Sequence, residues 1–264
     1  MKLLLKPLLL TLIPALLVGM LQPVWAEDIR YEQKIEDLAY GVALFDFYQS
    51  NNLGAITVIE TAIQRKQLTR RPQDATLLLG GLYFEYGLEN EAELIFNDLL
   101  GIQLESQSQN RVWYSLAKLH YEHNDFAQSE AFLSRIEQKL SPQREANKQY
   151  MLSNLYLNKG ELSTAIKYAL DIPKDNIWLA YAQYNIGVSL LSDRQFEQGQ
   201  EWLSTLSETT SDDEEVYALQ DAANLALGMN AIKRQQPAQA VKYFSRIQLS
   251  SSLSNKALLG TGWA

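Results

Sequence analysis

Apolar residues recur along this chain at the spacing of α-helices. They stand at i, i+3, i+4 and i+7 through most of the sequence, and no stretch alternates apolar and polar residues for long, as a strand would. In the clearest stretch Leu79, Tyr83 and Phe96 are expected to face inward between two paired helices. Gly87 interrupts the pattern between two runs of about twelve residues. The pattern predicts a helix, a tight turn and a second helix, and hence an all-α protein.

Small residues mark a repeat within this helical pattern. Five pairs stand twelve positions apart, at successive steps of 37, 36, 34 and 41 residues. Such a period is typical of helical repeat arrays. Because only small side chains let two helices cross closely, each pair predicts the crossing point of one helix pair. The pairs are Gly80/Ala92, Ala117/Ser129, Ser153/Ala165, Gly187/Gly199 and Gly228/Ala240.

These units resemble the tetratricopeptide repeat (TPR), whose pattern is Trp-x2-Leu-Gly-x2-Tyr, then Ala-x3-Phe, and often Pro. Leu79-Gly80, Tyr83, Ala92 and Phe96 match it in one unit, and the other four units match it in part. The resemblance implies a right-handed superhelical solenoid of antiparallel helix pairs. It also implies a protein that binds other proteins and is not an enzyme.

Four regions are expected along the chain. Residues 1–26 form a signal peptide, residues 27–70 a degenerate N-terminal helical repeat, residues 71–250 five TPR-like repeats, and residues 251–264 the start of a further repeat. The last residues, Gly262-Trp263-Ala264, continue a helix without a second helix or a polar cap, which a solenoid end requires. The sequence therefore predicts a fragment of a longer array.

The N-terminus predicts export. Lys2 and Lys6 precede an apolar run over 8–21, and Ala26 supplies a small residue for cleavage. An uncleaved signal that anchors the chain is the alternative. No later stretch reaches the roughly 18 apolar residues that a membrane-spanning helix needs. We expect a bacterial periplasmic protein, soluble after cleavage, and the absence of cysteine excludes disulfides and a lipoprotein anchor.

The charge and composition of the chain limit the kinds of ligand and reaction that can be expected. The formal charge of −8 becomes about −10 when Lys2 and Lys6 are removed, so nucleic-acid binding is disfavoured. The two histidines, His120 and His123, could place two metal ligands on one helix face. We instead expect His120 in the core, where the TPR pattern has Tyr, and His123 in solvent. No catalytic, cofactor-binding or metal-binding residue is predicted.

The repeat register predicts a partner-binding surface on the concave face. Three tyrosines stand three residues before a small residue of the first helix, and the other candidates stand one or four residues after it. Tyrosine combines a large apolar ring with a polar hydroxyl, which suits recognition. Packing of the tyrosines between adjacent repeats is the alternative, and the sequence leaves both open. The predicted residues are Tyr114, Lys118, Tyr121, Tyr150, Asn154 and Tyr184.

Two main functions remain compatible with these observations. The first is a non-catalytic exported scaffold that holds a protein or peptide partner in a cell-envelope complex. The alternative is the helical scaffold of a larger cell-wall or polysaccharide-processing enzyme whose catalytic part lies beyond residue 264. A lectin-like role for the tyrosines is a third possibility. Membrane contact is expected only through partners or an uncleaved signal, and the oligomeric state is left open.

Overall fold

A computed structural model describes residues 38–68 and 72–264, and all regular elements within them are α-helices. The predicted signal peptide at 1–26 lies outside the described residues. Six consecutive helix pairs are followed by one further helix. The pairs are α1 (Leu38–Tyr48) with α2 (Asn52–Gln64), α3 (Pro72–Glu85) with α4 (Glu89–Leu100), α5 (Ser106–Glu122) with α6 (Phe126–Leu133), α7 (Pro142–Asn158) with α8 (Leu162–Leu170), α9 (Ile177–Ser192) with α10 (Phe196–Ser207), and α11 (Glu214–Lys233) with α12 (Pro237–Phe244); α13 spans Ser254–Trp263.

The small residues lie where the two helices of a pair cross. A Cβ atom added to Gly199 would stand 2.9 Å from the carbonyl oxygen of Gly187, so these two backbones are in contact. In the α5/α6 pair, the Ser129 hydroxyl donates a 2.8 Å hydrogen bond to the carbonyl of Ala117. The prediction that these residues mark close crossings is confirmed. The first pair obeys the same rule, because Ala43 and Ala55 are also twelve positions apart and fully buried.

Every helix pair is joined by a turn of the same shape. One residue, always seven positions after the small residue of the first helix, adopts a left-handed backbone with φ between 56° and 84°. Glycine adopts this conformation without strain, yet only two of the six turns use it. The six residues are Ser50, Gly87, Asn124, Gly160, Arg194 and Gln235.

The hydrophobic core runs continuously through neighbouring pairs. Leu79 of α3 belongs to a cluster with Ala55 and Ile59 of α2, so it joins its own pair to the preceding one. The sequence pattern predicts only that Leu79 faces inward between the helices of its own pair. Phe96 of α4 lies against Gly80 and joins a cluster that extends into α5. Because each pair buries its apolar face against the next, stability is shared along the array.

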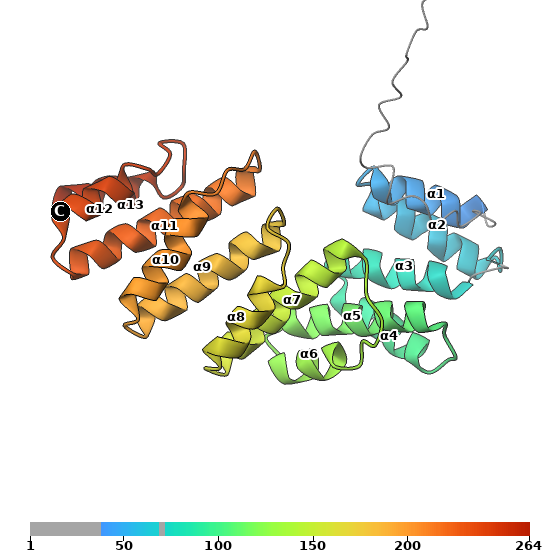
Figure 1. Ribbon diagram of the computed structural model, residues 1–264. Helices are drawn as coiled ribbons and strands as arrows, with labels where there is room; N and C mark the ends of the chain where they lie inside the picture. The colour runs from blue at the N-terminus through green and yellow to red at the C-terminus, as the bar shows by residue number, and fades with distance from the viewer. Residues whose placement is uncertain (1–37, 69–71) are drawn as a thin grey trace, which may run out of the picture.

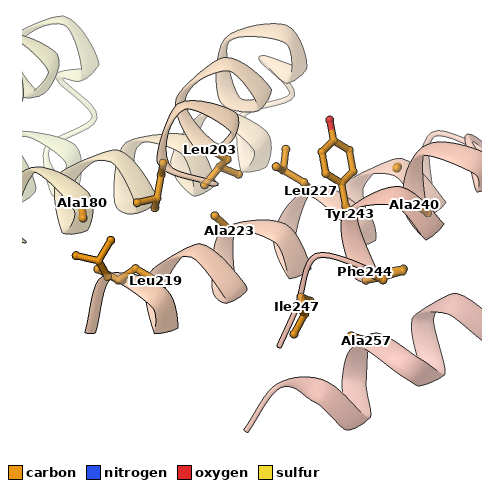
Figure 2. Close-up of a cluster of buried hydrophobic side chains, with 13 residues drawn as sticks. Ala180, Leu203, Leu219, Ala223, Leu227, Ala240, Tyr243, Phe244, Ile247 and Ala257 are labelled. Atoms are coloured by element: carbon orange, nitrogen blue, oxygen red, sulfur yellow. The ribbon is translucent and has the colours of Figure 1, made fainter. Parts of the chain in front are cut away.

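The last helix completes the C-terminal cluster. Phe244 of α12 fits between two glycines, since a Cβ on Gly228 of α11 or on Gly260 of α13 would come within 2.6 Å of its ring. Figure 2 shows Phe244 and Ile247 on the side that faces Ala257 of α13. Gly260 therefore occupies a close-packing position like those of the earlier repeats.

The helix pairs follow one another along an arc (Figure 1). First helices contact the first helices of neighbouring pairs, as α3 with α5, α5 with α7, α7 with α9 and α9 with α11. Second helices of the described pairs make no comparable contacts with one another. The first helices are thus closer together and form the inner, concave side. The right-handed superhelix implied by the resemblance stays a prediction.

Candidate functional site on the inner face

A groove of about 250 Å³ lies on the inner side of the first four helix pairs. Its walls come almost entirely from the first helices α1, α3, α5 and α7, so residues far apart in the sequence meet there. Both aromatic rings and cations line it. We call this feature the inner groove; its main lining residues are Tyr40, Leu44, Phe47, Tyr48, Phe84, Glu85, Arg111, Tyr114, Lys118 and Arg144.

Tyr114 lines the inner groove with its ring, but its hydroxyl is used within the protein. The residue is only 9% exposed, and the hydroxyl donates a 2.7 Å hydrogen bond to Oδ1 of Asn147 on α7. Burial raises the pKa of Tyr114 to about 12. This tyrosine therefore joins two adjacent repeats, as the packing interpretation of the tyrosines expects.

Lys118 is the most accessible of the predicted residues on this stretch of the groove. Its Nζ lies 5.0 Å from the centre of the Phe84 ring, in a cation–π arrangement. Glu85 and Glu122 lie 3.9 and 3.7 Å from the same nitrogen. These carboxylates neutralise the ammonium group, so Lys118 offers a partner less net charge than the sequence suggested.

Tyr121, Tyr150 and Asn154 are connected by hydrogen bonds across three repeats. Asn154 is buried, and its Nδ2 donates to the Tyr121 hydroxyl over 2.7 Å. Asn185 of α9 donates to Oδ1 of Asn154 over 3.0 Å and to the Tyr150 hydroxyl over 3.4 Å. Burial and the nearby Tyr150 raise the pKa of Tyr121. The network fixes α5, α7 and α9 relative to one another.

An aromatic cluster extends this network along the inner face. The Tyr150 ring stacks on Trp178 at 4.9 Å between centroids, and lies 5.8 Å from Tyr181 and 6.3 Å from Tyr121. All four rings are partly exposed. Tyr184, the sixth predicted residue, packs against the C-terminal core cluster. The structure therefore places Tyr114 and Lys118 in the inner groove and joins Tyr121, Tyr150 and Asn154 in one network, while Tyr184 packs toward the next repeats.

Two cations in the inner groove were not among the predicted residues. Arg144 lies on α7, nine positions before Ser153, and Arg111 lies on α5, six positions before Ala117. Trp178 and Tyr181 hold the equivalent positions before Gly187. The sequence could have indicated these positions, because residues three, six and nine positions before the small residue follow one another along one side of the first helix. Of these three, the prediction considered only the residue three positions before it.

The histidines occupy structural positions. His120 is largely buried, stacks on Phe132 at 5.3 Å and has Nδ1 3.4 Å from Asp125. His123 is exposed, and its Nε2 lies 2.5 Å from Glu89. Both placements agree with the sequence interpretation. Within the described residues, no group of three or more His, Asp or Glu side chains could hold a metal ion.

A larger hollow of about 630 Å³ lies elsewhere, between residues 171–176, helices α9 and α10, and the long loop before α11. Trp202 and several hydroxyl-bearing side chains, among them Thr205 and Thr209, line it. It contains none of the predicted partner-binding residues.

None of the described helices has both the length and the apolar character needed to cross a bilayer.

The paired helices, the constant turns and the groove on the first helices define a helical-repeat protein with the TPR fold. No protein-family model matches the chain, and no curated protein matches it. Among solved structures, it is similar to a tetratricopeptide repeat protein from Parabacteroides merdae ATCC 43184. The TM-score is 0.52 at 10% identity, over 85% of this chain and 96% of that one. This likeness establishes the fold.

Proposed function

We propose that this protein is a non-catalytic adaptor that binds a peptide segment of a partner protein in its inner groove. The observation that carries the proposal is the groove itself, because it collects aromatic rings and cations from four successive first helices onto one concave surface. Aromatic and arginine side chains dominate binding energy at protein interfaces. A groove spanning several repeats also suits an extended segment better than a small metabolite.

Photocross-linking tests this proposal even while the partner is unidentified. A photoreactive benzoylphenylalanine is placed at Ser115 in the inner groove, or at exposed Leu94 on the outer helix α4 as the matched control. After irradiation in the native cells, we expect a discrete adduct from Ser115 and none from Leu94. Adducts from Leu94 alone would move binding to the outer face and contradict the proposal.

We further propose that the adaptor works in a bacterial cell envelope after export. The support is the basic start, apolar run and small residue of the first 26 positions, together with the acidic remainder of the chain. Cell fractionation and intact-mass measurement test this part separately. We expect periplasmic protein beginning at Glu27. Full-length protein confined to the cytoplasm would refute export and leave the groove proposal untouched.

A further inference from the structure

We propose that Arg111 and Arg144 together form an anion-binding site in the inner groove, which takes an aspartate or glutamate side chain of the bound peptide. The inference rests on the proposed function, because it assumes that a peptide occupies this groove. It goes further by naming the chemistry of that peptide: an acidic residue flanked by apolar ones.

The position of Arg144 is costly in the free protein. Burial lowers the pKa of its guanidinium and the nearby positive charge of Arg111 lowers it further, and the opposing effects of Tyr114 and Tyr48 do not cancel this. Arg144 also lies in the first turn of α7, where the helix dipole disfavours a cation. Within residues 38–68 and 72–264, no carboxylate lies within ion-pair distance of it, and no acceptor takes a hydrogen bond from it. A partly buried cation is normally paired.

The Arg111 guanidinium also lacks part of its hydrogen-bond partners. Its Nε is buried and has no hydrogen-bond partner among the described residues. The closest carboxylate, Asp74, lies 4.0 Å from its NH1 and accepts a 3.1 Å hydrogen bond from Ser108. Two guanidinium groups whose donors are not all paired therefore share one groove. The Arg111 Nε is buried, so an incoming carboxylate would accept hydrogen bonds from the terminal nitrogens of the two arginines and offset their mutual repulsion.

The surroundings select a carboxylate carried by an apolar peptide segment. Phe47, Tyr48 and Phe84 line the same groove as the two arginines and offer apolar ring surface there. The acidic groups nearby are Asp74 beside Arg111, and Glu85 and Glu122 beside Lys118. Arg144 thus remains the least compensated cation in the groove, on a protein whose formal charge is −8.

Peptide selection tests the inference directly. The purified protein is incubated with a bead library of random octapeptides that carry C-terminal amides, so that only side chains can supply a carboxylate. We expect wild-type protein to enrich peptides with Asp or Glu beside apolar residues. Arg111→Gln and Arg144→Gln should lose this enrichment. Arg194→Gln removes an exposed arginine in the α9/α10 turn, outside the groove, and should retain it.

Affinity and stability measurements separate binding from a structural role. For the best acidic peptide, we expect Arg144→Gln, or a peptide with Gln in place of Glu, to weaken binding at least about tenfold. The free Arg144→Gln protein should melt at the same temperature as wild type or higher, because an uncompensated cation has been removed. A lower melting temperature for this variant would show that Arg144 is structural and would overturn the inference.

The remaining outcomes distinguish the inference from the proposed function. Enrichment of peptides without acidic residues, unchanged in both arginine variants, would overturn the anion site and leave peptide binding in the groove intact. No enrichment of any peptide would also overturn the anion site. In that case cross-linking from Ser115 decides whether the groove still binds a folded partner.

Discussion

Single small residues determine how closely the helices of this array approach. Gly187 and Gly199 leave no room for a side chain between α9 and α10, whereas Gly81, in the middle of α3, has no atom within 4 Å of a Cβ position. All three glycines lie inside helices, and they differ in whether atoms of a neighbouring helix lie where a side chain would be. Substitution by alanine should therefore have opposite effects at the two sites.

Alanine at Gly199 should destabilise the protein by about 1–3 kcal/mol, because its Cβ would collide with the backbone carbonyl of Gly187, which cannot move aside alone. Alanine at Gly81 should instead stabilise it by up to about 1 kcal/mol, through higher helix propensity. Urea unfolding followed by circular dichroism measures both changes. Equal midpoints for the two variants would contradict the close crossing.

At the scale of elements, each helix pair depends on its turn and on hydrogen bonds to the next pair. The turns keep one left-handed residue at a constant position even where the side chain disfavours it, as at Arg194 and Gln235. Between pairs, polar side chains about one repeat apart in the sequence bond to each other, as Tyr114 does with Asn147. These two devices set the shape of one unit and its orientation to the next.

Glycine in place of Arg194 or Gln235 should raise the free energy of unfolding by up to about 1 kcal/mol, because the left-handed backbone costs a side-chain-bearing residue roughly that much. Gln236, the next residue, has φ of −114° and serves as the control. Glycine there should bring no gain and lower stability slightly, since it only adds freedom to the unfolded chain. Thermal melts of the three variants make the comparison.

Alanine at Asn154 should lower the free energy of unfolding by about 1–3 kcal/mol. The substitution leaves the Tyr121 hydroxyl and the Asn185 amide without their shared partner in a partly buried site. Asn97, exposed on α4, is the matched control and should change stability by less than about 0.5 kcal/mol on the same substitution. If the Asn154 variant had the same urea midpoint as the Asn97 variant, the hydrogen-bond network would not contribute to the free energy of unfolding.

At the scale of the whole molecule, three tyrosines with raised pKa values make the stability of the array depend on alkaline pH; Tyr114 is buried, and Tyr83 and Tyr181 are partly buried. Burial raises the pKa of Tyr83 to about 12, with a contribution from Glu60. The hydrogen bond to Glu215 and burial raise the pKa of Tyr181 to about 12, and burial raises that of Tyr114 likewise. These tyrosines lie on three different repeats, so their ionisation is expected to destabilise more than one part of the array.

Stability should fall as the pH rises from 10 to 12. An unfolded tyrosine loses its proton near pH 10, whereas these folded ones keep it, so the stabilisation is complete below pH 10 and is lost toward pH 12. For well-buried Tyr114 the slope is about 1.4 kcal/mol per pH unit. Tyr114→Phe should reduce the slope, measured by urea unfolding at stepped pH with tyrosinate absorbance. An unchanged slope would show that Tyr114 ionises normally.

The sequence alone determined the class of fold and the place of its close contacts. Helical spacing, the twelve-residue interval between small residues and the period are local properties, and the contacts they imply lie within one pair. The same register placed His120 in the core and His123 at the surface. The small residues also repeat in α1/α2, where Ala43 and Ala55 were available to the same reasoning.

The tertiary structure decided which polar side chains meet. Whether the Tyr114 hydroxyl faces a partner or Asn147 depends on the angle between neighbouring repeats, which the register does not contain. Arg111 and Arg144 stand 33 positions apart on different helices, and only the stacking of α5 on α7 and the curvature toward α1 place them in one groove. Periodicity fixes contacts within a unit, because they are local. The chemistry of the groove depends on the accumulated geometry of four units.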